Sequence, residues 1–291
     1  MSQLHKAQLQ FSLLKVRYLD YNIIMRKVII ITGANSGLGL EFAKQLAASK
    51  NKADCEFWLI ARNYEKLTEA KQNISSSISE KQIKLFAMDI SGKNGVAQFD
   101  SLLRKEKETS EFCIDMLINN AGFGTYGPFE ETPLEKELNM IDLNCTSLTG
   151  ICGLCLPFLQ KGSRIINVSS LAAFLPLGNF AVYAATKAYV LSFSIALAAE
   201  LRDKGIFVTA LCPGSVSTNF ANVASNGARE KVLHGKDPKK VVAHCLKKVS
   251  KGKTTAIWAP KWKMTAFISR FVSRYTGARY TYLFNKRPYK Q

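Results

Sequence analysis

Apolar and polar positions divide most of the chain into short apolar runs and longer segments with helical spacing. Residues 28–31 are four consecutive β-branched residues, followed by Thr32 and Gly33. An uninterrupted run of this kind predicts a strand buried on both faces, as in a parallel sheet. From Leu38 to Ala47 the apolar residues recur at helical spacing. The segment therefore predicts a strand, a glycine-containing turn and a helix.

The same alternation continues along the chain. Further strands are predicted at residues 56–61, 83–87, 114–119, 164–168, 206–211 and 254–259, and helical segments from residue 64 and at 133–159, 179–203 and 237–250. Residues 214–236, rich in Ser, Asn, Gly and Ala, predict a mobile segment or lid. Alternating strands and helices form right-handed crossovers. We expect an α/β fold, a doubly wound parallel sheet of about seven strands (Rossmann-type), in a single domain.

The turn after the first strand has glycines at positions 33, 37 and 39. A helix N-terminus offers backbone N–H groups to an anion, and glycines let a pyrophosphate approach the backbone closely. A tight turn without a ligand is the alternative explanation of this spacing alone. Ligands of such sheets bind beyond the carboxyl ends of the strands. The residues predicted to lie there are Thr32, Arg62, Asp89, Asn119, Ser169, Ser170, Pro213 and Gly214.

The formal net charge of +18 is concentrated near the C-terminus. Residues 229–291 hold 17 Lys and Arg against Glu230 and Asp237, so the basicity says little about the core. The cysteines number seven and are scattered, which indicates free thiols in a reducing compartment, and we expect a cytoplasmic protein. No secretory signal or membrane-spanning apolar run is expected. Cys152 and Cys155 lack a second pair, and we expect no metal site.

Tyr183 and Lys187 lie four residues apart at the start of a predicted helix, so their side chains share one face. A free tyrosine, with a pKa near ~10, is a poor acid or base at neutral pH. A neighbouring ammonium favours the phenolate and lowers that pKa. We therefore expect Lys187 to make Tyr183 a usable proton donor or acceptor near pH 7.

Two further polar residues occupy positions of interest. Ser170 ends a predicted strand 13 residues before Tyr183 and could hold a substrate oxygen beside the phenol; the alternative for Ser169 and Ser170 is helix capping or a turn. Asn144 lies within an apolar helical stretch, where asparagine is mildly unfavourable. It therefore has either a functional role or a buried hydrogen bond to the backbone.

Taken in order, these motifs resemble the short-chain dehydrogenase/reductase family, in its single-domain branch, over about residues 27–259. They are Thr32-Gly33-x-x-x-Gly37-x-Gly39, Asn119-Asn120-Ala121-Gly122, Asn144, Ser170, Tyr183-x-x-x-Lys187 and Pro213-Gly214. The resemblance implies a nicotinamide dinucleotide and a catalytic set of Asn144, Ser170, Tyr183 and Lys187. In such enzymes the Tyr transfers the proton and the Ser orients the carbonyl or hydroxyl. The Lys binds the nicotinamide ribose and tunes the Tyr, and the Asn holds a water.

The resemblance also implies which residues contact the cofactor. They are Gly33, Asn35, Ser36, Gly37, Leu38, Gly39, Arg62, Asp89, Ile90, Asn119, Ala121, Gly122, Tyr183, Lys187, Pro213, Gly214, Val216 and Thr218. An acidic residue after the second strand selects NAD, and a nearby Arg accommodates the phosphate of NADP. Here Ala61 and Arg62 occupy those positions. We therefore expect NADP(H) rather than NAD(H), unless Arg62 is only a solvated surface charge.

We accordingly expect an NADP(H)-dependent oxidoreductase that interconverts a carbonyl and a secondary alcohol by hydride transfer, working as a reductase. An apolar pocket suits a lipid-, steroid- or 3-oxoacyl-like substrate. Its candidate residues are Phe123, Phe129, Phe174, Leu175, Leu177, Phe180 and Phe220. Alternatively, most of these residues belong to the core or to a subunit interface. Rival functions are a non-catalytic NADP-binding regulator or scaffold, and a membrane-surface module acting through the basic tail. The family implies a homo-oligomer.

The predicted domain spans residues 27–260, between an N-terminal extension at 1–26 and a basic amphipathic segment at 261–291. In the latter, Trp262, Phe267, Ile268, Phe271 and Val272 can share one face of a helix. The segment either packs against the substrate mouth or a second subunit, or makes peripheral contact with an anionic membrane. Nucleic acid is the weakest alternative, because no nucleic-acid module is recognisable. For the extension, a short surface helix or disordered arm is expected, and translation from Met25 is a hypothesis.

Overall fold

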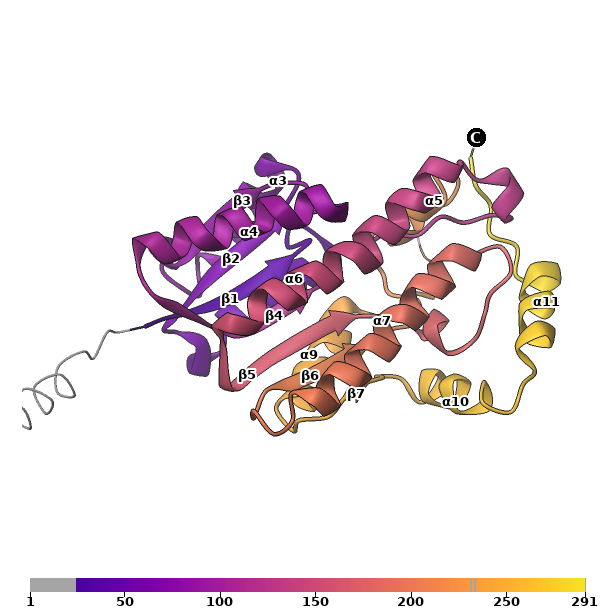
Figure 1. Cartoon of the computed structure of the whole chain (residues 1–291). Coiled ribbons are helices and arrows are strands. Elements are labelled where there is room, and N and C mark those ends of the chain that lie inside the picture. The colour runs from indigo at the N-terminus through magenta and orange to yellow at the C-terminus, as the bar shows by residue number, and fades with distance from the viewer. Residues whose placement is uncertain (1–24, 231, 233, 291) are drawn as a thin grey trace, which may run out of the picture.

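Seven parallel strands form the centre of the molecule, and the computed structural model arranges them in the order β3-β2-β1-β4-β5-β6-β7 (Figure 1). The structure describes residues 25–230, 232 and 234–290. The strands are β1 Arg26–Thr32, β2 Cys55–Ala61, β3 Ile83–Ala87, β4 Phe112–Asn119, β5 Leu159–Val168, β6 Phe207–Leu211 and β7 Thr255–Ala256. The predicted doubly wound sheet is therefore confirmed.

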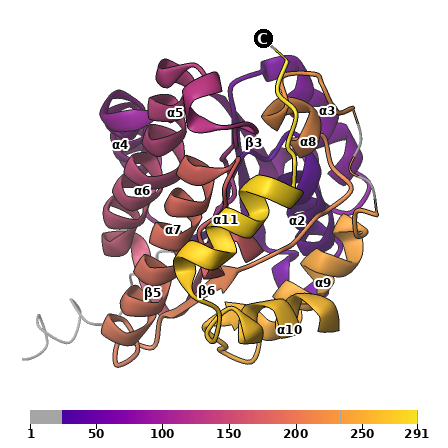
Figure 2. The same cartoon turned by 90° about the vertical axis from the view of Figure 1, so that its right-hand side faces the viewer.

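Helices cover both faces of the sheet, as Figure 2 shows edge-on. One layer contains α2 (Gly37–Ala47), α3 (Tyr64–Ile74) and α9 (Pro238–Val249), and the other contains α4 (Gly92–Thr109), α5 (Leu134–Ile141), α6 (Leu148–Cys155) and α7 (Ala181–Glu200). The first strand serves both layers. Ile29 and Ile31 pack towards α2, whereas Val28 and Ile30 pack towards α4. All four are fully buried, which explains why the strand is apolar at every position.

Helix α4 was not predicted, because it contains two glycines and few apolar residues. Gly95 has a structural reason. A Cβ at this position would overlap the backbone of Ile90, so only glycine lets the helix lie against the end of β3. The buried Phe99 and Leu103 then attach α4 to the sheet.

The helix predicted over residues 133–159 is divided. Helix α5 continues into a π-helical turn, Asp142–Ser147, and α6 then ends at Cys155. Residues 159–163, expected partly in this helix, instead begin β5, where Gly162 has a φ of +97°. At the other edge, β7 comprises two residues rather than the predicted six, because Pro260 starts a new helix shortly after it.

The C-terminal segment forms two helices, α10 (Pro260–Ile268) and α11 (Arg274–Phe284), rather than one amphipathic helix. The predicted common apolar face does not exist. Trp262 is buried in the core, whereas Phe267 and Phe271 are 56% and 75% exposed, and α10 ends before Phe271. Figure 2 shows α11 lying across the molecule between α7 and α8 (Phe220–Ala224). The segment predicted as a lid includes α8.

Two helical stretches, Leu134–Phe158 and Ala181–Glu200, are long and apolar enough to cross a membrane by length and composition alone. The sequence had predicted no such stretch. In the fold both belong to the helical layer on one face of the sheet, and α7 places Val190 and Leu197 in the core there. At the N-terminus, β1 begins at Arg26, which the sequence assigned to the extension. The arm predicted for residues 1–24 lies outside the described residues.

The turn after β1 is held by the turn after β4. The hydroxyl of Thr32 donates to the carbonyl oxygen of Ile118 at 3.3 Å and accepts the N–H groups of Asn120 and Ala121, each at 3.0 Å. The amide of Asn120 donates in return to the carbonyl oxygens of Thr32 and Gly33 at 3.0 and 3.1 Å. These bonds join the turns after β1 and β4, the two neighbouring strands between which the strand order changes direction.

Replacement of Thr32 by Val should lower the free energy of unfolding by about 1–3 kcal/mol, because a methyl group of similar size leaves two N–H groups without an acceptor. Urea denaturation followed by circular dichroism measures the change. Thr32→Ser retains the hydroxyl and should lose much less. Equal stability of Thr32→Val and the wild type would contradict the role assigned to this hydroxyl.

Candidate active site

A cleft of about 1900 Å³ opens at the carboxyl ends of the strands. Pockets for single small ligands usually have about 300–1,000 Å³, so this cleft has room for a dinucleotide and a substrate together. Most residues predicted to contact a cofactor line it: Gly33, Asn35, Ser36, Gly37, Leu38, Arg62, Asp89, Ile90, Ala121, Gly122, Tyr183, Lys187, Pro213, Gly214, Val216 and Thr218. Gly39 and Asn119 do not line it.

The glycine turn forms a cradle at the N-terminus of α2. Gly33 and Gly37 have φ angles of +63° and +54°, which favour glycine. A Cβ at Gly39 would overlap the carbonyl oxygen of Gly33, so Gly39 permits the helix to pack on the turn rather than touching a ligand. The side chain of Ser36 makes no capping hydrogen bond. The first N–H groups of α2 therefore have no acceptor from Ser36 and can bind an anion. This arrangement fits a pyrophosphate.

Arg62 follows β2 directly, and its side chain lines the cleft. It is exposed, and it makes no salt bridge with any described carboxylate. Lys66 of α3 lines the same part of the cleft. Asp89, after β3, accepts the N–H of Ser91 at 3.0 Å, so its carboxylate is already held in place.

The predicted contact at Asn119 is wrong for the side chain. Its amide donates to Asn167 Oδ1 at 2.9 Å and to Cys152 Sγ at 3.2 Å, inside the layer beneath α6. The residue is the last of β4, and alternation along the strand directs it away from the cleft. Asn120, one residue later, lines the cleft instead and supports the glycine turn.

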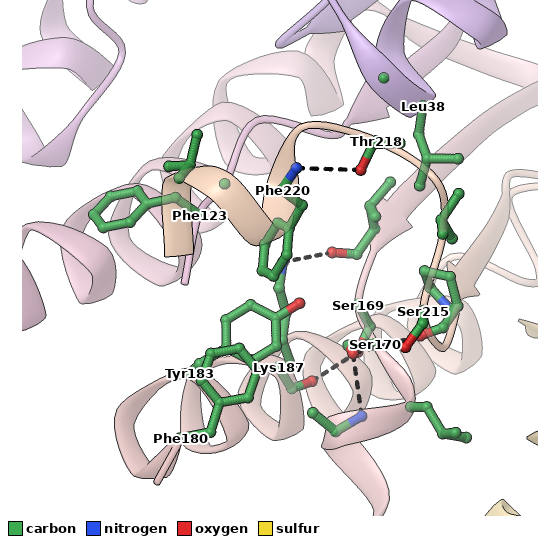
Figure 3. Close-up of a pocket in the computed structure, with 18 of the residues that line it drawn as sticks. Leu38, Phe123, Ser169, Ser170, Phe180, Tyr183, Lys187, Ser215, Thr218 and Phe220 are labelled. Atoms are coloured by element: carbon green, nitrogen blue, oxygen red, sulfur yellow. Dashed lines mark hydrogen bonds between the residues drawn. The ribbon is translucent and has the colours of Figure 1, made fainter. Parts of the chain in front are cut away.

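The phenol of Tyr183 lies within an aromatic cluster on one wall of the cleft (Figure 3). The ring of Phe180 stacks on it with centroids 4.1 Å apart, and the ring of Phe220 lies 5.4 Å away. Gly124, which the sequence analysis did not single out, leaves space for this cluster, because a Cβ there would overlap all three rings. Tyr126 extends the wall, with its ring 4.9 Å from that of Phe180.

Burial raises the pKa of Tyr183 well above its usual value, and the facing Ser170 hydroxyl lowers it only in part. Burial therefore outweighs the lowering of the Tyr183 pKa that was expected from Lys187. Lys187 Nζ lies 5.6 Å from the phenol ring centroid and donates to the carbonyl oxygen of Val168 at 2.9 Å. Burial in turn lowers the pKa of Lys187 to about 8. At neutral pH Tyr183 is protonated and Lys187 is mostly charged.

Ser169 and Ser170 follow β5 and have different roles. The hydroxyl of Ser169 donates to the carbonyl oxygen of Lys187 at 2.8 Å and thereby joins the strand end to α7. The hydroxyl of Ser170 accepts the N–H of Ala172 at 3.1 Å and so caps a short 3₁₀ turn, Leu171–Phe174. Ser170 lines the cleft beside Tyr183 (Figure 3). Capping and a place in the cleft, considered as alternatives from the sequence, occur together.

Asn144 lies in the π-helical turn, behind the wall of the cleft. Its Oδ1 accepts the N–H of Phe123 at 3.2 Å, and its Nδ2 donates to the carbonyl oxygen of Phe123 at 3.0 Å and to the hydroxyl of Thr186 at 3.1 Å. The side chain does not line the cleft. A Cβ at Gly122 would overlap Asn144 Oδ1, so these two positions are closely packed. Such π-helical turns are common at functional sites.

The apolar part of the cleft combines predicted and unpredicted residues. Phe123, Phe174, Leu175, Leu177, Phe180 and Phe220 line it as expected. Phe129 does not, because it lies exposed in a short turn, Phe129–Glu131. Trp262 of α10 packs on Gly214, where a Cβ would overlap the indole. Residues of α11 and of the chain after it also line the cleft, among them Thr281 and Arg287, and neither carried a sequence signal for this position.

Comparison with known proteins identifies related chains. A family model described as short chain dehydrogenase matches residues 27–228. A very-long-chain 3-oxoacyl-CoA reductase of Ajellomyces capsulatus is 30% identical over 241 residues, covering 80% of this chain and 67% of that protein. An uncharacterized oxidoreductase of Staphylococcus epidermidis is 30% identical over 211 residues, covering 72% of this chain and 86% of the other.

Two solved structures are similar. A short-chain dehydrogenase from Sphingobium yanoikuyae in complex with NADPH has a TM-score of 0.70 and 25% identity, with 85% of this chain and 94% of that chain covered. One from Burkholderia phymatum in complex with NAD has a TM-score of 0.71 and 20% identity, with 93% and 99% covered, and it shows the fold alone. From the matched residues, the sheet and the cleft, we conclude that this chain belongs to the short-chain dehydrogenase/reductase family of oxidoreductases.

Proposed function

We propose that the protein is an NADP(H)-dependent reductase that converts an apolar ketone or 3-oxoacyl group to a secondary alcohol. The observation that carries this proposal is the phenol of Tyr183, which lines the cleft beside Ser170 and is kept protonated by burial. A protonated phenol in a partly enclosed cleft can give a proton to an oxygen that becomes more basic during reduction. A nicotinamide cofactor held by the glycine turn would supply the hydride.

The chain's own groups have separate tasks in this proposal. Tyr183 donates a proton to the substrate oxygen, and the Ser170 hydroxyl donates a hydrogen bond that orients the same oxygen. Lys187, cationic up to about pH 8, favours the phenolate that remains after transfer. Asn144 is a positioning residue here, because its three hydrogen bonds hold Phe123 and Thr186 beside the cleft.

The substrate class rests on the lining of the cleft. Phe123, Phe174, Phe180 and Phe220 present apolar surface next to Tyr183, which favours an apolar chain or ring system. The similarity to a very-long-chain 3-oxoacyl-CoA reductase supports a lipid-like substrate.

Replacement of Tyr183 by Phe should lower kcat for ketone-dependent NADPH oxidation by about 100-fold or more, because the proton donor is lost while the ring remains. Tyr189→Phe is the matched control. Tyr189 lies on the same helix, is exposed and bonds the Thr149 hydroxyl at 2.8 Å, so its loss should leave the rate unchanged. Equal rates in Tyr183→Phe and the wild type would reject the proton donor. Failure of the wild type to oxidise NADPH with any ketone or 3-oxoacyl thioester would favour a non-catalytic regulator.

The cofactor preference rests on Arg62, an exposed cation without a described carboxylate partner directly after β2. Lys66 adds a second positive charge at this end of the cleft. A guanidinium there can bind the additional phosphate of NADP and offers nothing to select the bare ribose of NAD. The similar structure from Sphingobium yanoikuyae, in complex with NADPH, agrees with this preference.

Replacement of Arg62 by Asp should raise the KM for NADPH roughly tenfold or more and change that for NADH much less, since only NADPH loses a charge-assisted hydrogen bond. Lys50→Asp makes the same charge change in a short turn before β2, at the amino end of the strand that Arg62 follows, and should alter neither value. Steady-state kinetics with both cofactors measure the ratio. An equal loss for the two cofactors would remove Arg62 from the cofactor site.

We also propose a homo-oligomer. Helices α5 and α7, adjacent in one layer, expose large apolar residues: Leu134, Leu138, Ile141, Tyr189 and Ile195. Large apolar side chains exposed on neighbouring helices favour a protein interface. Sedimentation velocity should show a species larger than the 32.3 kDa chain, and a monomer at micromolar concentration would contradict the proposal.

We further propose a cytoplasmic protein in peripheral contact with anionic membranes. The cysteines in the described part of the chain are all free and mostly buried, which suits a reducing compartment. Around α10 the exposed apolar residues Met264, Phe267, Ile268, Phe271 and Val272 alternate with Lys261, Lys263 and Arg270. Cations and apolar side chains together favour an anionic lipid surface. Ile268 and Val272 also line the cleft, so an apolar substrate could enter from the lipid.

Joint replacement of Phe267 and Phe271 by Ser should abolish sedimentation with phosphatidylglycerol vesicles at low salt, because it removes the two most apolar side chains of this surface. Phe129→Ser removes an equally exposed aromatic ring elsewhere and should leave vesicle binding intact. Wild-type protein that stays in the supernatant at low salt would defeat the membrane proposal.

A further inference from the structure

Two arginines flank the aromatic wall at the mouth of the cleft. Arg229 comes from the chain after α8, and its guanidinium lies 5.8 Å from the ring centroid of Tyr126. Arg287 comes from the chain after α11, and its guanidinium lies 5.0 Å from the ring centroid of Phe180. The rings of Tyr126 and Phe180 are 4.9 Å apart, and Phe180 stacks on Tyr183. Both guanidinium groups are therefore next to the wall that holds the phenol.

Neither arginine forms a salt bridge with a carboxylate in the described part of the chain. The salt bridges formed by the described residues include neither Arg229 nor Arg287. Arg287 donates one hydrogen bond, to the carbonyl oxygen of Gly178 at 3.1 Å. Described carboxylates that line the cleft are Asp89, which is committed to Ser91, and Glu135, which pairs with neither arginine.

The charges of the two arginines act on the same space. Burial lowers the pKa of Arg287, and the positive charge of Arg229 lowers it further. Both arginines in turn oppose the rise that burial causes in the pKa of Tyr126. A guanidinium keeps its charge at physiological pH in such surroundings. Two partly buried cations without a counter-ion therefore create a positive potential that favours an anionic ligand.

The cofactor does not account for this charge. Its phosphates are expected at the glycine turn and at Arg62, beyond the ends of β1 and β2. The two mouth arginines contact Tyr126 and Phe180 instead. Figure 3 shows Phe180 on the side of Tyr183 that faces away from Leu38 in the first turn of α2. The positive charge thus lies at the substrate end of the cleft.

The C-terminal segment is built to hold Arg287 there. The N–H of Gly178 donates to the Thr281 hydroxyl at 2.8 Å, and the Asn179 amide donates to the carbonyl oxygen of Tyr282 at 2.9 Å. Asn179 has a φ of +59°, a conformation that asparagine tolerates better than most residues. The loop before α7, which carries Phe180, therefore also anchors α11, so the position of Arg287 is coupled to that of Tyr183.

We propose that the substrate carries an anionic group, bound by Arg229 and Arg287, and separated by an apolar segment from the carbonyl that Tyr183 protonates. The inference rests on the proposed reductase function and names the substrate class of the same site. The shared chemistry is an anion at the far end of an otherwise apolar molecule. Its source is either a carboxylate, as in an oxo-fatty acid, or a phosphate, as in an oxoacyl thioester of coenzyme A. The ring of Phe180 contacts both groups, with its centroid 5.0 Å from the guanidinium of Arg287 and 4.1 Å from that of the phenol ring.

The test compares substrates that differ only in the anion. One pair is a medium-chain oxo-fatty acid and its methyl ester, and the other is a 3-oxoacyl thioester of 4′-phosphopantetheine and that of pantetheine. The ratio of kcat/KM within each pair is measured with NADPH for the wild type, Arg229→Gln, Arg287→Gln and Arg287→Lys. Arg274→Gln is the matched control, because it removes an exposed charge at the start of α11 that does not line the cleft.

The wild type should prefer the anionic member of at least one pair, and each Gln variant should reduce that preference about tenfold or more. Arg287→Lys should restore part of it, and Arg274→Gln should leave it unchanged. A preference confined to the first pair identifies a carboxylate, and one confined to the second identifies a phosphate. The inference is overturned if the wild type shows no preference in either pair, or if the Gln variants retain it.

A binding measurement separates this inference from the proposed function. Titration calorimetry of the full chain with dodecanoate and with dodecanamide requires no turnover. Tighter binding of dodecanoate that is lost in Arg287→Gln supports the anion site even if no ketone is reduced. Equal binding of the two probes, together with ketone reduction that shows no preference within either pair, overturns the anion site and leaves the reductase standing.

Discussion

The reversal of strand order at β1 is the constraint on which the rest of the molecule depends. The chain extends from β1 to β2 and β3 on one side and from β4 to β7 on the other, so the turns after β1 and β4 diverge and leave a crevice. The Thr32 hydroxyl bridges these turns, and the Asn120 amide holds the glycine turn from the opposite side. These hydrogen bonds join residues 88 positions apart in the sequence, and they fix the two turns between which a dinucleotide can lie.

The chemistry of the site follows from how deeply its polar groups are buried. Tyr183, Lys187 and Asn144 are all enclosed by the layer that α7 and the π-helical turn build on the sheet. Burial disfavours charge, and it therefore raises the pKa of Tyr183 and lowers that of Lys187. The two shifts act in the same sense, since both favour the neutral forms. A protonated phenol is a suitable starting state for a proton donor, and the neighbouring Lys187, with a pKa of about 8, is still mostly charged at neutral pH.

The C-terminal segment combines a structural role with the proposed recognition of substrate. Trp262 secures α10 on Gly214, and α11 is hydrogen-bonded to the loop before α7. This segment lies beyond the residues matched by the family model, which end at 228. The sheet and the glycine turn thus lie largely within the residues that the family model matches, whereas Thr281 and residues 284–287, which line the cleft, lie outside them. Substrate preference can diverge in such a segment without disturbing the sheet.

The sequence alone determined the sheet, because consecutive apolar residues such as 28–31 have few stable positions other than a buried parallel strand. Most of the residues that it assigned to the site do line the cleft, since the carboxyl ends of strands are predictable once the strands are known. The order and spacing of the motifs identified the family. These inferences depend on contacts that are local or repeat regularly along the chain.

Other properties were decided only by the tertiary structure. The side chain of Asn119 points into the helical layer because of its position in the pleat of β4. Helix α4 was not predicted because Gly95, which is unfavourable in a helix, is required there by the close approach of the Ile90 backbone. Lys187 and Tyr183 shared the predicted helix face, but the shifts in their pKa values depend on desolvation by residues distant in sequence. Arg229 and Arg287 are likewise 58 residues apart in the sequence, yet in the fold the charge of one acts on the other. Burial and electrostatic interactions depend on which residues are neighbours in space, and the order of residues along the chain does not specify those neighbours.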